Sequence, residues 1–225
     1  MWTMELRVDG YDGYDDDGGR GSVRHLIFGL RGTLVDWDPR AALAGQYPDG
    51  VIDMVLDPED EWGIWRFRTL MNLGWDQKRV LADYESTHGP AVAWVFRLYL
   101  EGFARTVKGM QPGMAGLLAD LHDRGLHLWG LANTTAEHAR QASELLEPLG
   151  LLEDTLISAE EHLRMPDGLV YRLALRRFGI PAGRTIFVGD SWDDVAAAET
   201  CGIRGLLFTG AAQLRTDLRG FGLPC

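Results

Sequence analysis

Short apolar runs alternate with segments of helical periodicity from Arg24 to the end of the chain. Five runs have the length and composition of buried strands, and they span residues 25–30, 126–133, 155–158, 185–190 and 205–208. In the segments beside the last four runs, apolar residues recur three and four positions apart, and three of these segments end in a helix-stopping glycine. This order predicts an α/β fold in which helices cover both faces of a mainly parallel sheet of five or six strands. Because sites in such sheets form beyond the carboxyl ends of the strands, we expect the strands that end at Gly29, Ala132 and Asp190 to lie near one another.

Residues 40–108 interrupt this alternation, because they contain no convincing strand and at least three helical patterns. The last pattern carries a broad apolar stripe that includes Phe96, Tyr99 and Phe103. The same block holds four of the eight tryptophans, at positions 62, 65, 75 and 94. We predict a small helical domain inserted after the first strand. Its tryptophans are expected to pack in a core, with ligand stacking as the less common alternative.

Residues 1–21 are acidic, rich in glycine and without a repeating period. Such a composition cannot bury enough apolar surface to order itself, so we expect a disordered tail. A metal-binding role for its aspartates is the less common alternative, since acidic runs are usually solvated.

Composition and charge narrow the class of protein. The 225 residues are 46% apolar, and the net charge of -11 argues against a general binder of nucleic acid or anionic membranes. No apolar run approaches the roughly 20 residues of a membrane span, and the first residues lack the basic-then-apolar order of a signal peptide. Cys201 and Cys225 have no metal-binding or disulfide spacing, which suits a reducing compartment. We therefore expect a cytoplasmic protein.

Four ordered motifs carry a resemblance to a known family: "FGLRGTLVDWDPR", "LWGLANTTAEH", "RMPDGLVYRLALRRFGI" and "TIFVGDSWDDVAAAETCGI". They resemble the haloacid-dehalogenase-like (HAD) superfamily, in the branch with a helical cap after the first strand. The resemblance implies a Rossmann-like three-layer core over residues 22–39 and 109–225, with a helical cap over residues 40–108.

The resemblance also implies a covalent mechanism that this chain departs from. In the family, an aspartate at the end of the first strand is the nucleophile, and in its phosphatases an acid two residues later protonates the leaving group. A Ser or Thr holds the transferred group, a lysine offsets charge, and acids after the fourth strand hold Mg²⁺. Aligning the motifs places Gly29, Arg31, Ala132 and Met165 at the first four positions, whereas Asp190 and Asp194 keep the acids, with Asp193 beside them.

Two hypotheses follow. The first is a catalytically degenerate HAD-like protein, a pseudoenzyme that works by binding a ligand or a protein partner. The second is an active phosphatase-like or dehalogenase-like hydrolase with a non-standard nucleophile such as Asp36 or Asp38, although Asp38 before Pro39 is also a typical helix cap. Thr134 or Thr135 could replace the hydroxyl missing at Ala132, but helix capping is the commoner role.

The substituted motif positions also determine which metal ions and small molecules we expect the chain to bind. We expect no tightly bound Mg²⁺; if the second hypothesis holds, Asp190 and Asp194 would anchor it. His122, His127, His138 and His162 lack zinc spacing, so surface or core roles are expected. An unknown small molecule or protein partner is expected in the cap–core cleft, with no nucleic acid and no membrane. The candidate cleft residues are Arg31, Thr33, Trp37, Asn133, Asp190 and Trp192.

Some of these residues have an open alternative. We expect Arg31 to pair with Asp190, Asp194 or both across the old metal position, the alternative being that it points outward into solvent. For Asp190 the alternative is a role in loop geometry and helix capping, and for Trp37 and Trp192 it is packing of their loops.

Overall fold

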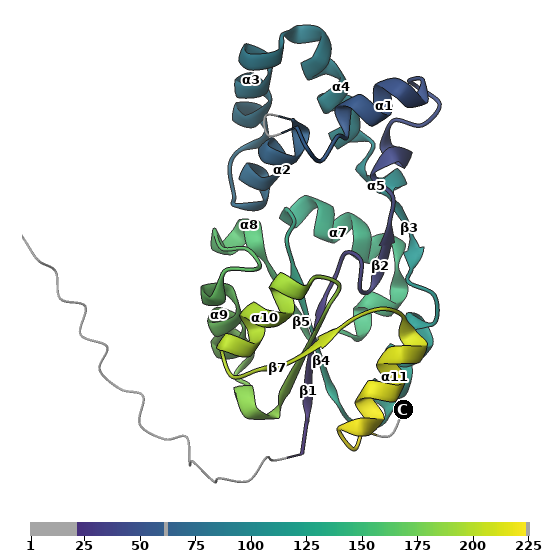
Figure 1. Ribbon diagram of the computed structural model, residues 1–225, viewed down its shortest axis with the longest axis vertical. Coiled ribbons are helices and arrows are strands. Elements are labelled where there is room, and N and C mark those ends of the chain that lie inside the picture. Colours follow the sequence, from purple (N-terminus) through teal and green to yellow (C-terminus); the bar gives the residue numbers. More distant parts are fainter. Residues whose placement is uncertain (1–21, 61–62, 224–225) are drawn as a thin grey trace, which may run out of the picture.

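A central sheet of five parallel strands, in the order β5-β4-β1-β6-β7, organises the structure (Figure 1). The computed structural model describes residues 22–60 and 63–223, so the N-terminal segment expected to be disordered and Trp62 lie outside the described residues. The strands are β1 (His25–Gly29), β4 (His127–Ala132), β5 (Asp154–Ile157), β6 (Thr185–Gly189) and β7 (Arg204–Leu207). All five predicted strands are confirmed to within one residue. Because β4 and β6 both pair with β1, the strand ends at Gly29, Ala132 and Asp190 are neighbours, as predicted.

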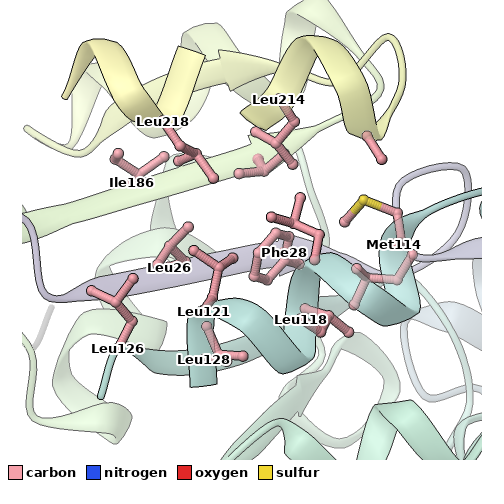
Figure 2. Close-up of a cluster of buried hydrophobic side chains, with 14 of the residues drawn as sticks. Leu26, Phe28, Met114, Leu118, Leu121, Leu126, Leu128, Ile186, Leu214 and Leu218 are labelled. Carbon is pink, nitrogen blue, oxygen red and sulfur yellow. The ribbon is translucent and has the colours of Figure 1, made fainter. Parts of the chain in front are cut away.

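Helices cover both faces of this sheet. On one face, α6 (Met114–Asp123) and α11 (Ala211–Gly220) pack against Leu26 and Phe28 of β1, as Figure 2 shows. On the other face, α9 (Gly168–Phe178) and α10 (Trp192–Thr200) pack in the cluster that contains Ile27. These three successive residues of β1 are fully buried, because a parallel strand covered on both faces has no side that meets water. The predicted three-layer α/β fold is confirmed.

Four further elements complete the core. They are α7 (Ala136–Leu145), η2 (Glu147–Leu151), α8 (Ser158–Glu161) and η3 (Ala182–Arg184). In the described part of the chain, no helix has the length and apolar character needed to cross a membrane.

Residues 39–106 form a group of helices above the sheet, which we call the helical insertion (Figure 1). Its elements are η1 (Pro39–Ala42), α1 (Asp49–Val55), α2 (Ile64–Asn72), α3 (Gln77–His88), α4 (Pro90–Glu101) and α5 (Phe103–Thr106). Side chains of this segment make a buried cluster of their own, centred on Ile64, Phe96 and Tyr99. The helical insertion therefore has a core separate from that of the sheet.

Two features of this region differ from the sequence-based prediction. A two-stranded antiparallel ribbon, β2 (Val35–Trp37) and β3 (Val107–Met110), joins the insertion to the sheet domain, although no strand was expected in residues 40–108. Both strands are short, and Val107 also continues the helical apolar stripe that precedes it. The last helical pattern of the block, residues 91–109, was expected to form one helix. It is interrupted at Gly102, where a Cβ would come within 2.6 Å of the Ala42 carbonyl oxygen.

Candidate ligand site between the helical insertion and the core

The loop after β1 is packed tightly against the loop after β6. Gly32 has a φ of +79°, and a Cβ there would lie 1.9 Å from Oδ2 of Asp190, so only glycine fits. The chain then turns back, with the amides of Leu34 and Val35 donating to the carbonyl oxygen of Leu30 at 2.8 and 2.9 Å. The Asp190 carboxylate is therefore held directly against the backbone of the β1 loop.

Gly29 ends β1 at a place where a side chain would fit. A Cβ added there would meet the Thr33 hydroxyl at 3.4 Å and the Val188 carbonyl oxygen at 3.6 Å, which are ordinary contacts. Oγ1 of Thr33 is itself buried without a hydrogen-bond partner. The loop thus presents an unsatisfied hydroxyl to a position that carries only a hydrogen atom.

The loops after β4 and before α9 are joined by one asparagine. Nδ2 of Asn133 donates to the Met165 carbonyl oxygen at 3.0 Å, and its Oδ1 accepts from the Met165 amide at 2.9 Å. The hydroxyl of Thr135 accepts from the amide of His138 at 3.2 Å and caps α7. Thr135 therefore has the capping role, and Asn133 fixes the backbone at Met165.

A cleft of about 340 Å³ lies where these loops meet the helical insertion. Its walls comprise the strand-end loops of β1, β4 and β6, the ribbon strand β2 and residues of α2, α5 and α7. Of the six residues predicted for it, four line the cleft: Arg31, Trp37, Asn133 and Asp190. The other two predictions are not met. Thr33 is fully buried beneath the loop, and Trp192 is 70% exposed at the start of α10, outside the cleft lining.

The ion pair predicted for Arg31 is not formed. Within residues 22–60 and 63–223, no carboxylate lies within 4.0 Å of its guanidinium, which instead stacks 4.6 Å from the ring centroid of Trp37. The residue stays exposed to solvent at the cleft, and the partial burial of its guanidinium, followed by repulsion by Arg68, lowers the pKa of Arg31. Asp190 acts in the opposite direction, so it attracts Arg31 from beyond direct contact.

Arg68 is the principal cleft residue that sequence reasoning missed. It is 5% exposed, and Nη1 donates to the hydroxyl of Tyr99 at 2.8 Å. Its guanidinium also lies 5.3–5.4 Å from the ring centroids of Trp37, Trp65 and Tyr99. Burial lowers the pKa of Arg68. A signal was available in the sequence, because Arg68 occupies the apolar stripe of α2, four residues after Ile64.

His138 also lines the cleft, and it had been expected to have a surface or core role. It is buried, and its ring stacks on Phe103 with the ring centroids 3.7 Å apart. Nδ1 has no hydrogen-bond partner. Burial, followed by the positive charge of Arg68, lowers the pKa of His138 to about 4, so the imidazole is neutral at pH 7. It therefore joins the insertion to α7 without adding charge.

Three carboxylates, Asp190, Asp193 and Asp194, also line the cleft. Burial, followed by the negative charge of Asp190, raises the pKa of Asp194 to about 6. The capping role considered for Asp190 is not formed, since Ser191 is the N-cap of α10. In the described part of the chain, no three Asp, Glu, His or Cys side chains are grouped to hold a metal, and Arg31 and Arg164 share the same cleft. This donor set does not fit a resident Mg²⁺.

The two aspartates considered as alternative nucleophiles lie outside the cleft lining. Oδ1 of Asp38 accepts from the amide of Arg40 at 2.9 Å and caps η1, as the sequence indicated. Asp36 is exposed on β2, in register with Gly109 of β3.

A parallel α/β core whose strand-end loops meet a helical insertion is a Rossmann-like architecture, in which ligands bind beyond the carboxyl ends of the strands. Sequence comparison defines the family. Residues 23–202 match the haloacid dehalogenase-like hydrolase family, and the chain belongs to it.

Two curated relatives are phosphatases. The chain is 30% identical over 119 residues to sesquiterpene phosphatase astK of Aspergillus oryzae, and the match covers 52% of this chain and 61% of that protein. It is 27% identical over 194 residues to a phosphoglycolate phosphatase of Pseudomonas fluorescens, covering 80% of this chain and 67% of the relative. The matched region thus spans only about two thirds of the length of either relative.

Solved structures of the family share the fold at low sequence identity. A HAD family enzyme of Bacteroides thetaiotaomicron, in complex with magnesium and inorganic phosphate, matches with a TM-score of 0.66 and 16% identity over 84% of this chain and 95% of that one. A HAD-like family hydrolase of Porphyromonas gingivalis matches with a TM-score of 0.65 and 14% identity, over 91% of this chain and 100% of that one. These likenesses establish the fold.

Proposed function

We propose that this HAD-family chain binds a ligand in the cleft between the helical insertion and the core and does not hydrolyse it. The observation that carries the proposal is Gly29 at the end of β1, where the family resemblance places the nucleophilic aspartate. Glycine has no side chain to attack a substrate, and loss of a covalent nucleophile can cost on the order of a millionfold in rate. Arg31, Ala132 and Met165 replace three further reactive groups, which supports the same conclusion.

The surrounding scaffold supports a retained binding role. Gly32 still packs on Asp190, and Asn133 still ties the β4 loop to Met165. A concave site of about 340 Å³ lies within the usual range for small-molecule pockets, which favours a small ligand over a protein partner. We therefore propose that the cleft is preserved while the reactive side chains of the family are missing from it.

The two phosphatase relatives favour a competing function, a hydrolase of phosphate esters with a non-standard nucleophile. Asp36 and Asp38 were the candidates for that role. Their positions outside the cleft lining, and the use of Asp38 as a cap, support the non-catalytic proposal over this alternative.

Hydrolysis assays on the purified full chain test the proposal. Phosphate release from a panel of phosphomonoesters and halide release from 2-haloacids would be measured with and without Mg²⁺, beside the Pseudomonas fluorescens phosphatase as a positive control. We expect no turnover above the rate of a heat-denatured sample. Mg²⁺-dependent turnover that disappears in Asp36→Asn or Asp38→Asn would establish the competing hydrolase instead.

A further inference from the structure

Two arginines meet at one tryptophan in the cleft without a carboxylate partner. The guanidinium groups of Arg31 and Arg68 lie 4.6 and 5.3 Å from the ring centroid of Trp37. The ring is held in place because its Nε1 donates to Oγ1 of Thr106 at 2.8 Å. Within the described residues, Arg68 has a single hydrogen bond, to Tyr99, and neither arginine lies within 4.0 Å of a carboxylate. The cleft thus contains two neighbouring positive charges with unfilled hydrogen-bonding capacity.

This arrangement is unfavourable unless an anion completes it. Removing a charged group from water costs several kcal/mol, and Arg68 is 95% buried in a region where cation–π contacts return only part of that cost. Asp190 and Asp194 attract Arg31 from beyond direct contact, whereas among the described residues no carboxylate pairs with the buried charge of Arg68. A guanidinium presents several donors in a planar fork that matches phosphate or carboxylate oxygens.

The remaining wall beside these arginines is largely apolar. It is formed by Phe103, Val107, Ala139, Ala142 and Met165. Arg164 also lines the cleft. An organic body could therefore lose water along this wall while a charged end reaches the arginines.

We propose that the cleft binds a small organic anion, with a compact phosphate or carboxylate head at Arg31 and Arg68 and an apolar body along the Phe103–Met165 wall. The inference rests on the proposed binding function and adds the chemical class of its ligand. The head group lies at the insertion side of the cleft, beside Trp37.

Calorimetric titration of the full chain with hexylphosphonate tests this assignment. The phosphonate cannot be hydrolysed, so binding is measured independently of any turnover. Hexanoate compares a carboxylate head, whereas 1-hexanol and hexyltrimethylammonium retain the apolar body with no charge or the opposite charge. We expect both anions to bind at least about tenfold more tightly than the alcohol or the ammonium compound, the difference that one charge-assisted contact supplies.

Matched variants locate the head group. Arg31→Met and Arg68→Met should each weaken hexylphosphonate binding by about tenfold or more, and Arg68→Lys should retain part of it. Arg97→Met removes the same charge from an exposed position on α4 and should leave the affinity within about twofold, because solvent and salt screen a distant charge. Thermal unfolding confirms that each variant is folded. Arg68→Met is expected to raise the midpoint, since it removes a buried unpaired charge.

Three results would overturn the assignment: equal binding of 1-hexanol and hexylphosphonate, an affinity unchanged in Arg68→Met, or no binding of either anion. A lower unfolding midpoint for Arg68→Met with unchanged affinity would make Arg68 a packing residue of the insertion. None of these three results would be evidence for hydrolysis. Turnover in the phosphomonoester assay, in contrast, would refute the proposed function without contradicting the preference of the cleft for anions.

Discussion

The Thr33 side chain in the β1 loop is fully buried, and among the described residues its hydroxyl has no hydrogen-bond partner. A Cβ added at Gly29 would lie 3.4 Å from this hydroxyl. A buried hydroxyl without a hydrogen bond costs roughly 1–3 kcal/mol in mutational data. The loop therefore retains a polar atom that suits a carboxylate at residue 29 and destabilises the chain as it stands.

Thr33→Val is expected to increase the free energy of unfolding by about 1 kcal/mol, because valine keeps the β-branched shape and removes the unsatisfied hydroxyl. Urea unfolding measures the change. In a Gly29→Asp background the sign should reverse, since the new carboxylate would accept from Thr33. A cycle of these two substitutions that shows no coupling would contradict the hydroxyl–carboxylate relationship.

The acid side of the cleft predicts a pH dependence. Burial and the charge of Asp190 raise the pKa of Asp194 from 3.8 to about 6 in the folded chain. The folded state therefore binds this proton more tightly than the unfolded state, so its contribution to stability falls as pH rises from about 4 to about 6. Asp194→Asn should stabilise the chain at pH 8 by roughly 1 kcal/mol after solvent screening, and the difference should vanish near pH 4.

Urea unfolding at pH 4 and pH 8 measures this difference between the parent chain and Asp194→Asn. Glu101→Gln, which removes one negative charge from an exposed position on α4, is the matched control and should change stability by less than about 0.5 kcal/mol. Equal stabilisation by Asp194→Asn at both pH values would indicate a steric effect of the substitution and would contradict the predicted titration of Asp194.

Helix and strand elements show how much of the molecule was predictable. The five core strands are short apolar runs in a sheet that helices cover on both faces, so their composition alone predicts them. The ribbon of β2 and β3 was missed because a three-residue strand has no period to detect, and its pairing partner lies 70 residues away. Gly102 was read as a helix interior, whereas its contact with the Ala42 backbone ends α4.

The candidate site was predictable only where a motif pointed to it. The motifs placed Arg31, Asn133 and Asp190 in the cleft, but the partner of Arg31 was wrong because the aromatic face of Trp37 was not considered. Arg68 follows no motif, and its role depends on how the insertion meets the core. Such contacts between distant segments have no local signal in one sequence.

The N-terminus of α7 allows a direct test of element capping against a catalytic role. Thr135→Ala removes the oxygen that accepts from the His138 amide and should cost about 1 kcal/mol of stability, the usual value of an N-cap. Thr134→Ala on the adjacent residue is the control, and it should cost less than about 0.5 kcal/mol. Urea unfolding measures both, and equal losses would contradict the capping assignment.

For the molecule as a whole, the sheet and the insertion are two separately packed bodies that meet at a cleft. The family scaffold and the reactive groups are thus separable. Backbone contacts such as Gly32 on Asp190 are kept by packing, while side chains that face the cleft can change without loss of the fold. Membership of the family therefore fixes the fold of this chain, whereas its chemistry depends on the side chains that face the cleft.

Restoring the family residues tests that separation. We expect a variant with Gly29→Asp, Arg31→Asp, Ala132→Ser and Met165→Lys to fold, because a Cβ at residue 29 makes only ordinary contacts. Mg²⁺ should then raise the thermal midpoint of this variant and leave that of the parent chain unchanged. The reason is that Gly29→Asp adds a carboxylate beside Asp190, while Arg31→Asp removes a competing positive charge. Slow Mg²⁺-dependent hydrolysis of p-nitrophenyl phosphate should accompany the shift. Adding Asp190→Asn should abolish both effects. A folded variant that fails to bind Mg²⁺ would mean that the loops, and not only the side chains, have departed from the catalytic arrangement.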